Sequence, residues 1–368
     1  MLSRPMARMA GRQPGLPTPV MNDAPAIPSY RLCVAPMLDR TDRHCRALFR
    51  RLSPHALLYS EMITTAALLH GDAERHLAFD ASEHPVALQL GGSDPDDLAR
   101  CALLAERRGY DEVNLNCGCP SDRVQAGRFG ACLMKEPQLV ADCVAAMSDA
   151  VQIPVTVKCR IGVDDQDDYG ALAALVARVA GAGCTRFAVH ARKAWLRGLN
   201  PRQNREIPPL RHEIVQRLKG DFPQLKIIIN GGLQTLDDIR AQFAQGVDGV
   251  MLGRAAYTNP ALLAAADRQL FGGTAATWET LHGELRAGLL AGLARGTPLH
   301  RMTRHLLGLH QGRPGARAFR RHLSEHAPRA GAGIQVWDEA ISRLQTPPPT
   351  SSPSGSKGDD RAHSHFFQ

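Results

Sequence analysis

Residues 112–121 read EVNLNCGCPS, a short β-type run over 112–116 that passes directly into Cys117, Gly118, Cys119 and Pro120. A strand that ends in a polar residue, a thiol, a glycine and a proline is not selected for packing alone. In α/β folds, catalytic side chains lie at the C-terminal ends of parallel strands. The stretch therefore predicts an α/β fold with a cysteine at the edge that carries the chemistry.

Similar β-rich runs recur on both sides of this stretch, separated mostly by amphipathic helical segments. They lie at residues 31–35, 56–60, 86–90, 154–159, 186–190, 226–230 and 249–253, which makes eight strands in all. Helix starts are marked by Asp94 with Pro95, before a helix over 96–107, and by Thr235 with Asp238. This alternation predicts a (β/α)8 TIM barrel over 29–262, with an open doubly wound sheet as the alternative.

The strand pattern stops near residue 261, and helical segments follow at 278–295, 298–311 and 316–324. We therefore expect a small all-helical C-terminal domain over 263–345. Residues 1–28 are rich in proline, and residues 346–368 are of low complexity, so we expect both ends to be disordered. Met21 is an alternative start to Met1.

Composition narrows the class of protein. The chain has 368 residues, of which 44% are hydrophobic, enough for a large core. No apolar run approaches the roughly 20 residues that span a bilayer, so we expect a soluble protein without membrane contact. The nine cysteines are scattered, odd in number and without a CxxC pair. This pattern argues against disulfides or a zinc ribbon and indicates a reducing cytoplasm.

The positive charge is concentrated in two parts of the chain. The formal net charge is +8, with six Lys or Arg against one acid over 192–211 and seven Arg against one acid over 300–329. Together these segments would form one face suited to nucleic acid. Two separate solvated surfaces are an equally good interpretation of the charge alone.

If the barrel forms, the C-terminal ends of its strands converge on one site. The residues at those ends are Pro36, Met37, Leu38, Gln89, Asn116, Lys158, His190, Asn230, Gly231, Gly232, Gly253 and Arg254. Loops after the seventh and eighth strands often bind phosphate through backbone N–H groups. The stretch 230–232 and the pair at 253–254 therefore indicate a cofactor phosphate site, with a plain left-handed turn as the alternative for the glycines.

Lys158 and His190 lie on neighbouring predicted strands, where they can hold an anionic ring edge and a phosphate or ribityl group. A lysine at an apolar strand end needs a partner for its charge, whereas a single histidine there is often only structural. Gln89 can make paired hydrogen bonds to a planar imide edge. None of these groups is a redox centre, so the pocket predicts an organic cofactor and no metal.

The opening motif holds two thiols. Cys119 lies between Gly118 and Pro120 in a backbone open to the predicted pocket, and Cys117 can face either way. No set of partners makes Cys119 a zinc ligand, and as a nucleophile it would have only His190 as a base.

The chain resembles the tRNA-dihydrouridine synthases, most closely their A subgroup. The stretches that carry the resemblance are VAPMLDRTD at 34–42, QLGG at 89–92, NLNCGCPSDRVQ at 114–125, VKCRIG at 157–162, HARKAW at 190–195, NREIPPL at 204–210, NGG at 230–232 and GAR at 315–317. The resemblance covers about residues 30–325 and leaves out both ends.

The resemblance implies a barrel that binds FMN, NADPH as the reductant, and a helical domain that grips tRNA. It implies reduction of uridines 20 and 20a in the D-loop. We also expect the protein to be a monomer. The residues implied for FMN are Pro36, Met37, Leu38, Gln89, Lys158 and His190, with Asn230, Gly231, Gly232, Gly253 and Arg254 at its phosphate. Cys119 matches the proton donor, Asn116 a residue near the uracil, and Arg202, Arg205, Arg317 and Arg320 match tRNA contacts.

The implied chemistry is coherent. Hydride addition at C6 of uracil builds enolate character at C5, and an ordinary thiol, with a pKa of about 8.5, is largely protonated at pH 7. A small-molecule dehydrogenase of the dihydroorotate type would need neither the arginine clusters nor the helical domain. A non-catalytic RNA-binding protein would not need Cys119, Lys158 and His190 together. No dinucleotide fingerprint indicates where NADPH docks.

Overall fold

The computed structural model describes residues 27–121, 124–125, 127–166, 169–273 and 277–344. Eight parallel strands form a closed barrel in the order of the chain, and β1 pairs with β8. The strands are β1 (Leu32–Val34), β2 (Leu57–Thr64), β3 (Val86–Gly91), β4 (Glu112–Cys117), β5 (Val155–Arg160), β6 (Arg186–His190), β7 (Lys226–Asn230) and β8 (Gly249–Leu252). The predicted TIM barrel is confirmed, and closure excludes the open sheet.

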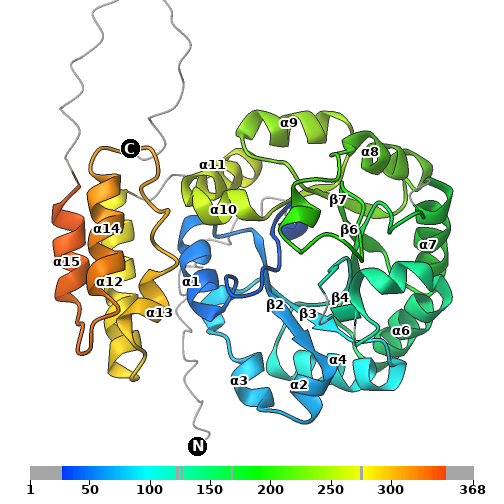
Figure 1. The fold of residues 1–368 in the computed structure, drawn as a ribbon, viewed down its shortest axis with the longest axis horizontal. Coiled ribbons are helices and arrows are strands. Elements are labelled where there is room, and N and C mark those ends of the chain that lie inside the picture. The colour runs from blue at the N-terminus through cyan, green and yellow to red at the C-terminus, as the bar shows by residue number, and fades with distance from the viewer. Residues whose placement is uncertain (1–26, 122–123, 126, 167–168, 274–276, 345–368) are drawn as a thin grey trace, which may run out of the picture.

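Helices surround the barrel on its outer side (Figure 1). They are α1 (Arg43–Leu52), α2 (Thr65–Leu69), α3 (Ala73–Leu77), α4 (Pro95–Arg108), α6 (Pro137–Ala150), α7 (Tyr169–Gly181), α8 (His212–Asp221), α9 (Leu236–Ala244), α10 (Arg254–Thr258) and α11 (Pro260–Phe271). Both predicted helix starts are confirmed. Asp94 accepts the backbone N–H of Asp97 ahead of Pro95, and Thr235 and Asp238 form a capping box.

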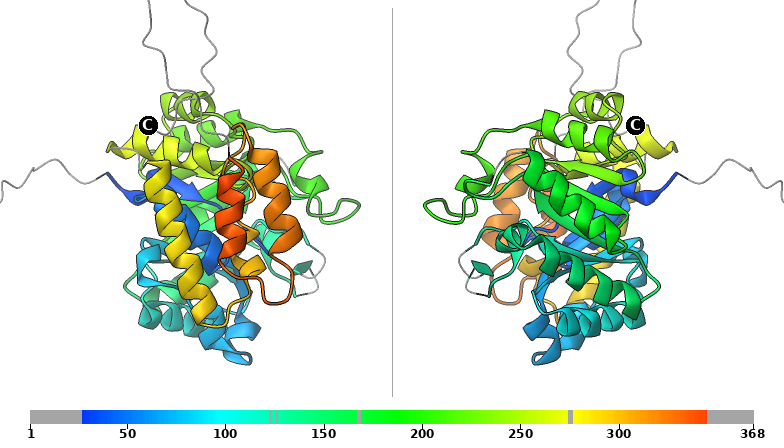
Figure 2. Two further views of the ribbon diagram at one scale, coloured as in Figure 1. Left: turned by 90° about the vertical axis from the view of Figure 1, so that its left-hand side faces the viewer. Right: turned by 90° about the vertical axis from the view of Figure 1, so that its right-hand side faces the viewer.

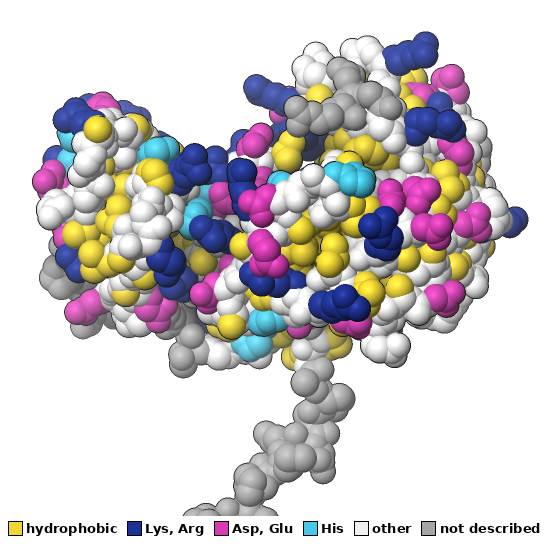
Figure 3. Space-filling model, turned by 90° about the horizontal axis from the view of Figure 1, so that it is seen from below, with side chains coloured by type: hydrophobic (Ala, Val, Ile, Leu, Met, Phe, Trp, Pro, Cys, Tyr) yellow, Lys and Arg dark blue, Asp and Glu magenta, His cyan; other side chains and the backbone are white. Residues whose placement is uncertain are grey.

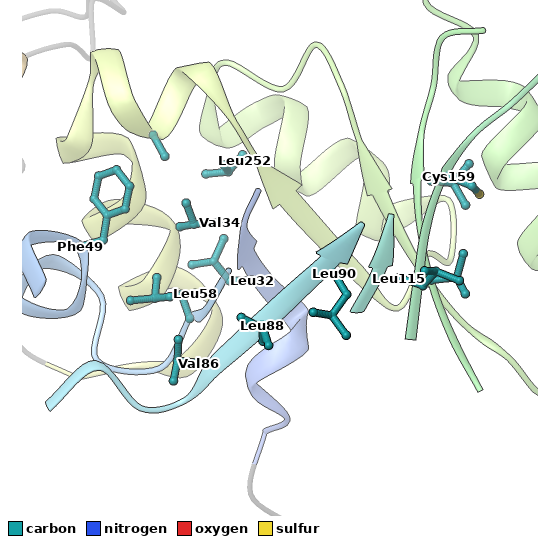
Figure 4. Packing of buried hydrophobic residues seen from close by; sticks show 14 of the residues in the cluster. Leu32, Val34, Phe49, Leu58, Val86, Leu88, Leu90, Leu115, Cys159 and Leu252 are labelled. Atoms are coloured by element: carbon teal, nitrogen blue, oxygen red, sulfur yellow. The ribbon is translucent and has the colours of Figure 1, made fainter. Parts of the chain in front are cut away.

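Alternation along each strand sorts the side chains into two environments. Residues that point outward pack against the helices, as Figure 4 shows for Val34 and Leu58 with Phe49 of α1. The inward positions contribute a smaller apolar cluster, Cys33, Ala35, Leu57, Tyr59, Ala87, Ala188, Ile228 and Met251. Because the interior is filled in this way, only the strand ends are left to form a site.

The C-terminal helices lie beside the barrel (Figure 1) and pack together (Figure 2). They are α12 (Trp278–Ala294), α13 (Leu299–Thr303), α14 (Ala316–His326) and α15 (Gln335–Ser342). Phe319 and Trp337 are fully buried between α14 and α15, with ring centroids 5.9 Å apart. This part therefore has an aromatic core of its own. No described helix is both long and apolar enough to cross a membrane.

The helix predicted over 298–311 is wrong beyond Thr303, where α13 ends. Gly308 lies so close to the end of α10 that an added Cβ would be 2.7 Å from the carbonyl oxygen of Thr258. Arg304 and His305 also turn toward the barrel, where both meet Asp42. Tertiary contacts therefore override the helical pattern of this segment.

Asp42 joins the helical part to the barrel. Its carboxylate caps the first turn of α1 and also meets Arg304 at 2.7 Å and Nε2 of His305 at 3.0 Å. Burial opposes ionisation of Asp42, but the hydrogen bonds from His305 and Arg304 outweigh it and hold its pKa well below its usual range.

The division predicted between residues 262 and 263 falls inside α11. This helix contacts α1, α9 and β1, all of which belong to the barrel. We propose that the barrel extends to the end of α11 and that the helical domain starts with α12. The disorder predicted for 1–28 and 346–368, like the choice between Met1 and Met21, falls outside the described residues apart from 27 and 28.

Candidate active site

Side chains from adjacent strands meet at the C-terminal end of the barrel. In the sheet register, Asn116 of β4 pairs with Lys158 of β5, and His190 of β6 pairs with Asn230 of β7. Asn116 donates from Nδ2 to Oε1 of Gln89 on β3 at 2.7 Å. The C-terminal ends of β3 to β7 thus carry a set of polar residues, here called the polar ring, made up of Gln89, Asn116, Lys158, His190 and Asn230.

Lys158 faces into this ring without a counter-ion. Among the described residues it has no hydrogen-bond or ion-pair partner, and it is only partly exposed. Burial, together with the positive charge of Arg160, lowers its pKa to about 8. A lysine held in this way favours a bound group that is anionic or rich in electrons.

His190 has an unused ring nitrogen. Its Nδ1 is buried and finds no hydrogen-bond partner in the described part of the chain. Burial lowers the pKa of His190 well below its usual range, and the charges of Arg160 and Lys158 lower it further, so the ring is neutral. An orphaned buried nitrogen indicates that a ligand completes the site.

The two glycines after β7 are required by the backbone. Gly231 and Gly232 have φ values of 107° and 76°, and a Cβ on Gly231 would lie 3.2 Å from the ring of His190. The carbonyl of Gly231 is held by Nε2 of His212 at 2.8 Å. Asn230 donates from Nδ2 to the carbonyl of Met251, which ties β7 to β8.

The two residues after β8, Gly253 and Arg254, do not form a simple phosphate-binding site. A Cβ on Gly253 would meet only ordinary contacts, the nearest being Cβ of Ala35 at 3.7 Å. Arg254 forms an ion pair with Glu206 at 2.7 Å. A phosphate at this place would therefore have to share the guanidinium with the carboxylate.

The loop after β1 lies beside these strands. The hydroxyl of Thr41 accepts the backbone N–H of Met37 at 2.9 Å, which closes a tight turn. Pro36 and Met37 are half-buried, whereas Leu38 is 61% exposed. Leu38 therefore presents an apolar side chain to solvent at the edge of the site.

The two thiols of the opening motif face opposite sides of the barrel wall. Cys117 is fully buried in the core between strands and helices, and burial raises its pKa well above the usual range. Cys119 is half-exposed, and its backbone N–H donates to Oδ1 of Asn116 at 3.0 Å. Its Sγ lies 3.5 Å from Oγ of Ser121. Only Cys119 of this pair is placed to meet a ligand.

Comparison with known proteins identifies the family of this chain. The model of the family described as "Dihydrouridine synthase (Dus)" matches residues 33–346. The chain belongs to the dihydrouridine synthase family. Proteins named "tRNA-dihydrouridine(20/20a) synthase" are 56% identical over 320 residues in Vibrio cholerae, which covers 86% of this chain and 97% of that protein. The relatives of that name in Escherichia coli and Pseudomonas aeruginosa are 57% identical over 317 residues and 56% over 328, covering 85% and 89% of this chain and 95% and 98% of those proteins.

In this member of the family, the arginines predicted to bind tRNA lie in two parts of the molecule. Arg202 and Arg205 belong to the segment after β6, which projects from the barrel in Figure 2. Arg317 and Arg320 are exposed on α14. Figure 3 shows Lys and Arg side chains along the border between the helical domain and the barrel.

One carboxylate, that of Glu206, partly neutralises this positive charge. Glu206 contacts Arg202 at 3.4 Å as well as Arg254. Burial and the charge of Arg254 lower the pKa of Arg205. This end of the barrel thus holds several cations close together, and a bound polyanion would reduce their mutual repulsion.

Arg160 has no role predicted from the sequence, yet it organises the loops around the site. Its guanidinium donates to the carbonyls of Gly118, Lys193 and Asn204, which belong to the segments after β4 and β6. Burial lowers the pKa of Arg160 to about 10. The available signal was its position, since Arg160 is the last residue of β5 and lies two residues beyond Lys158.

Proposed function

We propose that this protein uses FMN to reduce the C5–C6 bond of uridines 20 and 20a in the D-loop of tRNA, with NADPH as the reductant. The observation that carries the proposal is a half-exposed Cys119, whose turn is held by Asn116, at the same end of the barrel as Lys158 and His190. The names of its relatives give dihydrouridine synthesis at positions 20 and 20a of tRNA for those proteins.

The residues at the barrel mouth fit a flavin mononucleotide. Lys158 would face the electron-rich edge of its ring system, and the unused Nδ1 of His190 would bind the ribityl or phosphate part. Gly231 and Gly232 let the backbone come close to a phosphate, with Arg254 beside them. Pro36, Met37 and Leu38 would supply the apolar contact. Bound flavin, once reduced by NADPH, supplies the hydride that adds at C6 of the uracil.

The protein's own part in the chemistry is to place the uracil and to deliver a proton to C5. Cys119 is the proton donor, and Asn116 holds its turn while lying close to the base. A D-loop uridine must leave its stack to reach the barrel mouth, which costs a few kcal/mol. Arg202, Arg205, Arg317 and Arg320 would recover that cost through phosphate contacts.

The proposed partners are tRNA and NADPH, and the proposed state is a monomer in the cytoplasm. All nine cysteines are free, which suits a reducing compartment. A small-molecule dehydrogenase would not explain four arginines divided between the barrel and the helical domain.

The deciding experiment maps dihydrouridine by mass spectrometry in tRNA from a strain that lacks this protein. Dihydrouridine at positions 20 and 20a should disappear, return with the wild-type gene and stay absent with Cys119→Ala. The purified protein should be yellow and should reduce unmodified tRNA but not orotate or free uridine. Normal dihydrouridine in the deletion strain, with turnover of a free pyrimidine, would reject the proposal in favour of the small-molecule enzyme.

A further inference from the structure

A chain of polar side chains, buried from Glu112 onward, runs through the barrel interior toward the site. Its members are Arg186, Glu112, Thr156, Asn114, Gln89 and Asn116. Glu112, Asn114 and Asn116 occupy alternate positions of β4, so all three point inward. Burying a row of polar groups in a barrel core costs free energy unless each group has a hydrogen-bond partner. The direction of each hydrogen bond, from donor to acceptor, can therefore be worked out along the row.

The direction of the chain is set at Glu112. Its Oε2 is paired with Arg186 at 2.6 Å, and its Oε1 accepts the hydroxyls of Thr156 at 2.5 Å and Tyr59 at 2.6 Å. An ion-paired carboxylate has no proton to give. The proton of the Thr156 hydroxyl therefore points at Glu112, which leaves only the oxygen lone pairs of Thr156 for its other neighbour.

Each amide then follows from the one before. Asn114 must present Nδ2 to Thr156, at 2.8 Å, so its Oδ1 faces Nε2 of Gln89, also at 2.8 Å. Oε1 of Gln89 accordingly accepts Nδ2 of Asn116 at 2.7 Å. Oδ1 of Asn116 is left to accept the backbone N–H groups of Gly118 and Cys119, both at 3.0 Å.

Both ends of the chain require the same direction. The carboxylate of Glu112 can only accept, and the backbone N–H groups of Gly118 and Cys119 can only donate. Turning over one amide would bring two oxygens, or two N–H groups, face to face without water. Gln89 is left with one free N–H on Nε2 and one free lone pair on Oε1. Its orientation therefore decides where an imide edge finds a donor for its carbonyl oxygen and where it finds an acceptor for its N–H.

We propose that Glu112 and Thr156 are positioning residues that act through Asn114 to fix the amides of Gln89 and Asn116, and with them the turn of Cys119. The proposal rests on the proposed function, because it takes Gln89 as a flavin contact and Cys119 as the proton donor. Neither Glu112 nor Thr156 touches the site itself. Their effect is transmitted as the direction of hydrogen bonds.

The test breaks the chain at Thr156 and compares matched variants. Thr156→Val removes the hydroxyl with little change of shape, and Thr156→Ser restores it. Tyr59→Phe is the control, since it removes another buried hydroxyl from the same carboxylate but lies outside the chain. FMN affinity, the visible absorption bands of bound FMN, kcat, KM and melting temperature are measured for each variant.

Thr156→Val should weaken FMN binding about tenfold, the effect of one buried hydrogen bond left unmade, and should move the flavin bands. Thr156→Ser and Tyr59→Phe should keep the wild-type bands and affinity. If Thr156→Val does not fold, Asn114→Ala interrupts the same chain without touching the ion pair of Glu112 and should give the same changes.

Two results would overturn the proposal. One is wild-type FMN affinity and bands in folded Thr156→Val, or in Asn114→Ala where Thr156→Val does not fold. The other is an equal band shift in Tyr59→Phe, which would assign the effect to the surroundings of the carboxylate. A wild-type protein that binds no FMN and makes no dihydrouridine would instead reject the proposed function.

Discussion

Oδ1 of Asn116 accepts the backbone N–H of Cys119 at 3.0 Å, two residues beyond the end of β4. The same oxygen accepts the N–H of Gly118 at 3.0 Å, so one side chain holds the whole turn. The thiol is thereby positioned through its backbone, while the only hydrogen-bond partner of its Sγ among the described residues is the short side chain of Ser121, at 3.5 Å.

The first prediction separates the two thiols of the motif. Cys119→Ala should lower the rate of dihydrouridine formation by about 10² to 10⁴-fold, the usual contribution of a general acid, and leave FMN affinity unchanged. Cys117→Ala is the matched control. This variant should keep normal turnover and lose about 1 kcal/mol of stability, because the thiol of Cys117 packs in the core between the strands and the helices. Normal turnover in Cys119→Ala would assign the proton to water or another group.

The second prediction concerns pH and Lys158. Because its pKa in the free protein is about 8, FMN affinity should fall as the pH rises from 7 to 10 and the ammonium is lost. Lys158→Met should bind FMN weakly at every pH and show no such decline. Fluorescence titration of FMN measures both, with Lys219→Met as the control since Lys219 pairs with Asp248 instead. An unchanged pH profile in Lys158→Met would contradict the assignment.

Lys158 also makes the stability of the folded protein depend on pH, and in the direction opposite to its effect on FMN affinity. Its pKa is lowered from 10.5 to about 8 in the folded protein, so the unfolded chain holds the proton longer. Without flavin, stability should therefore rise as the pH increases through this interval. Lys158→Met should remove that rise in a denaturant titration.

The third prediction concerns the junction at Asp42. Asp42→Asn should lower stability by about 1–3 kcal/mol, because Arg304 and His305 would no longer face a charged acceptor. The lowered pKa of Asp42 means that the wild type has this stability above the ordinary aspartate pKa of about 4 and loses it as the pH falls further. The two melting temperatures should thus converge in acid. A gap that stays constant to the lowest pH would contradict this account.

The fourth prediction concerns tRNA. Replacing Arg317 and Arg320 by Glu should weaken tRNA binding and reduce its dependence on salt by about one unit of slope for each arginine replaced. NADPH oxidation by the bound flavin should be unchanged. Arg107→Glu on α4, compared with either of these replacements made singly, makes the same change of charge on the outer wall of the barrel and should have little effect. Equal weakening by Arg107→Glu would show that net charge, rather than α14, governs binding.

The barrel was predictable because its signals are local. All eight predicted strands are confirmed to within a few residues, since each is a short β-rich run bounded by turn residues, as at 186–190 and 226–230. The helical domain was harder. The helix predicted to reach 311 stops at Thr303 because Gly308 packs on the backbone of α10, and α15 was missed although Trp337 is its buried anchor.

The candidate site was predictable as a list of residues but not as a set of relationships. Strand ends identify Lys158 and His190, whereas only the structure reveals that, within the described residues, the lysine lacks a counter-ion and Nδ1 of the histidine lacks a partner. The pairing of Arg254 with Glu206 joins residues 48 positions apart and leaves no local pattern. The polar alternation of Glu112, Asn114 and Asn116 along β4 is the sequence signal that the buried polar chain leaves.

Asp42 serves two structures with one carboxylate, since it caps α1 and anchors Arg304 and His305 of the helical domain. A swing of the helical domain away from the barrel would therefore expose the first turn of a barrel helix. Only Asp39, Arg40 and Thr41 separate this anchor from the loop 36–38 at the barrel mouth. The contacts of Asp42 consequently couple the orientation of the helical domain to the loop at the barrel mouth.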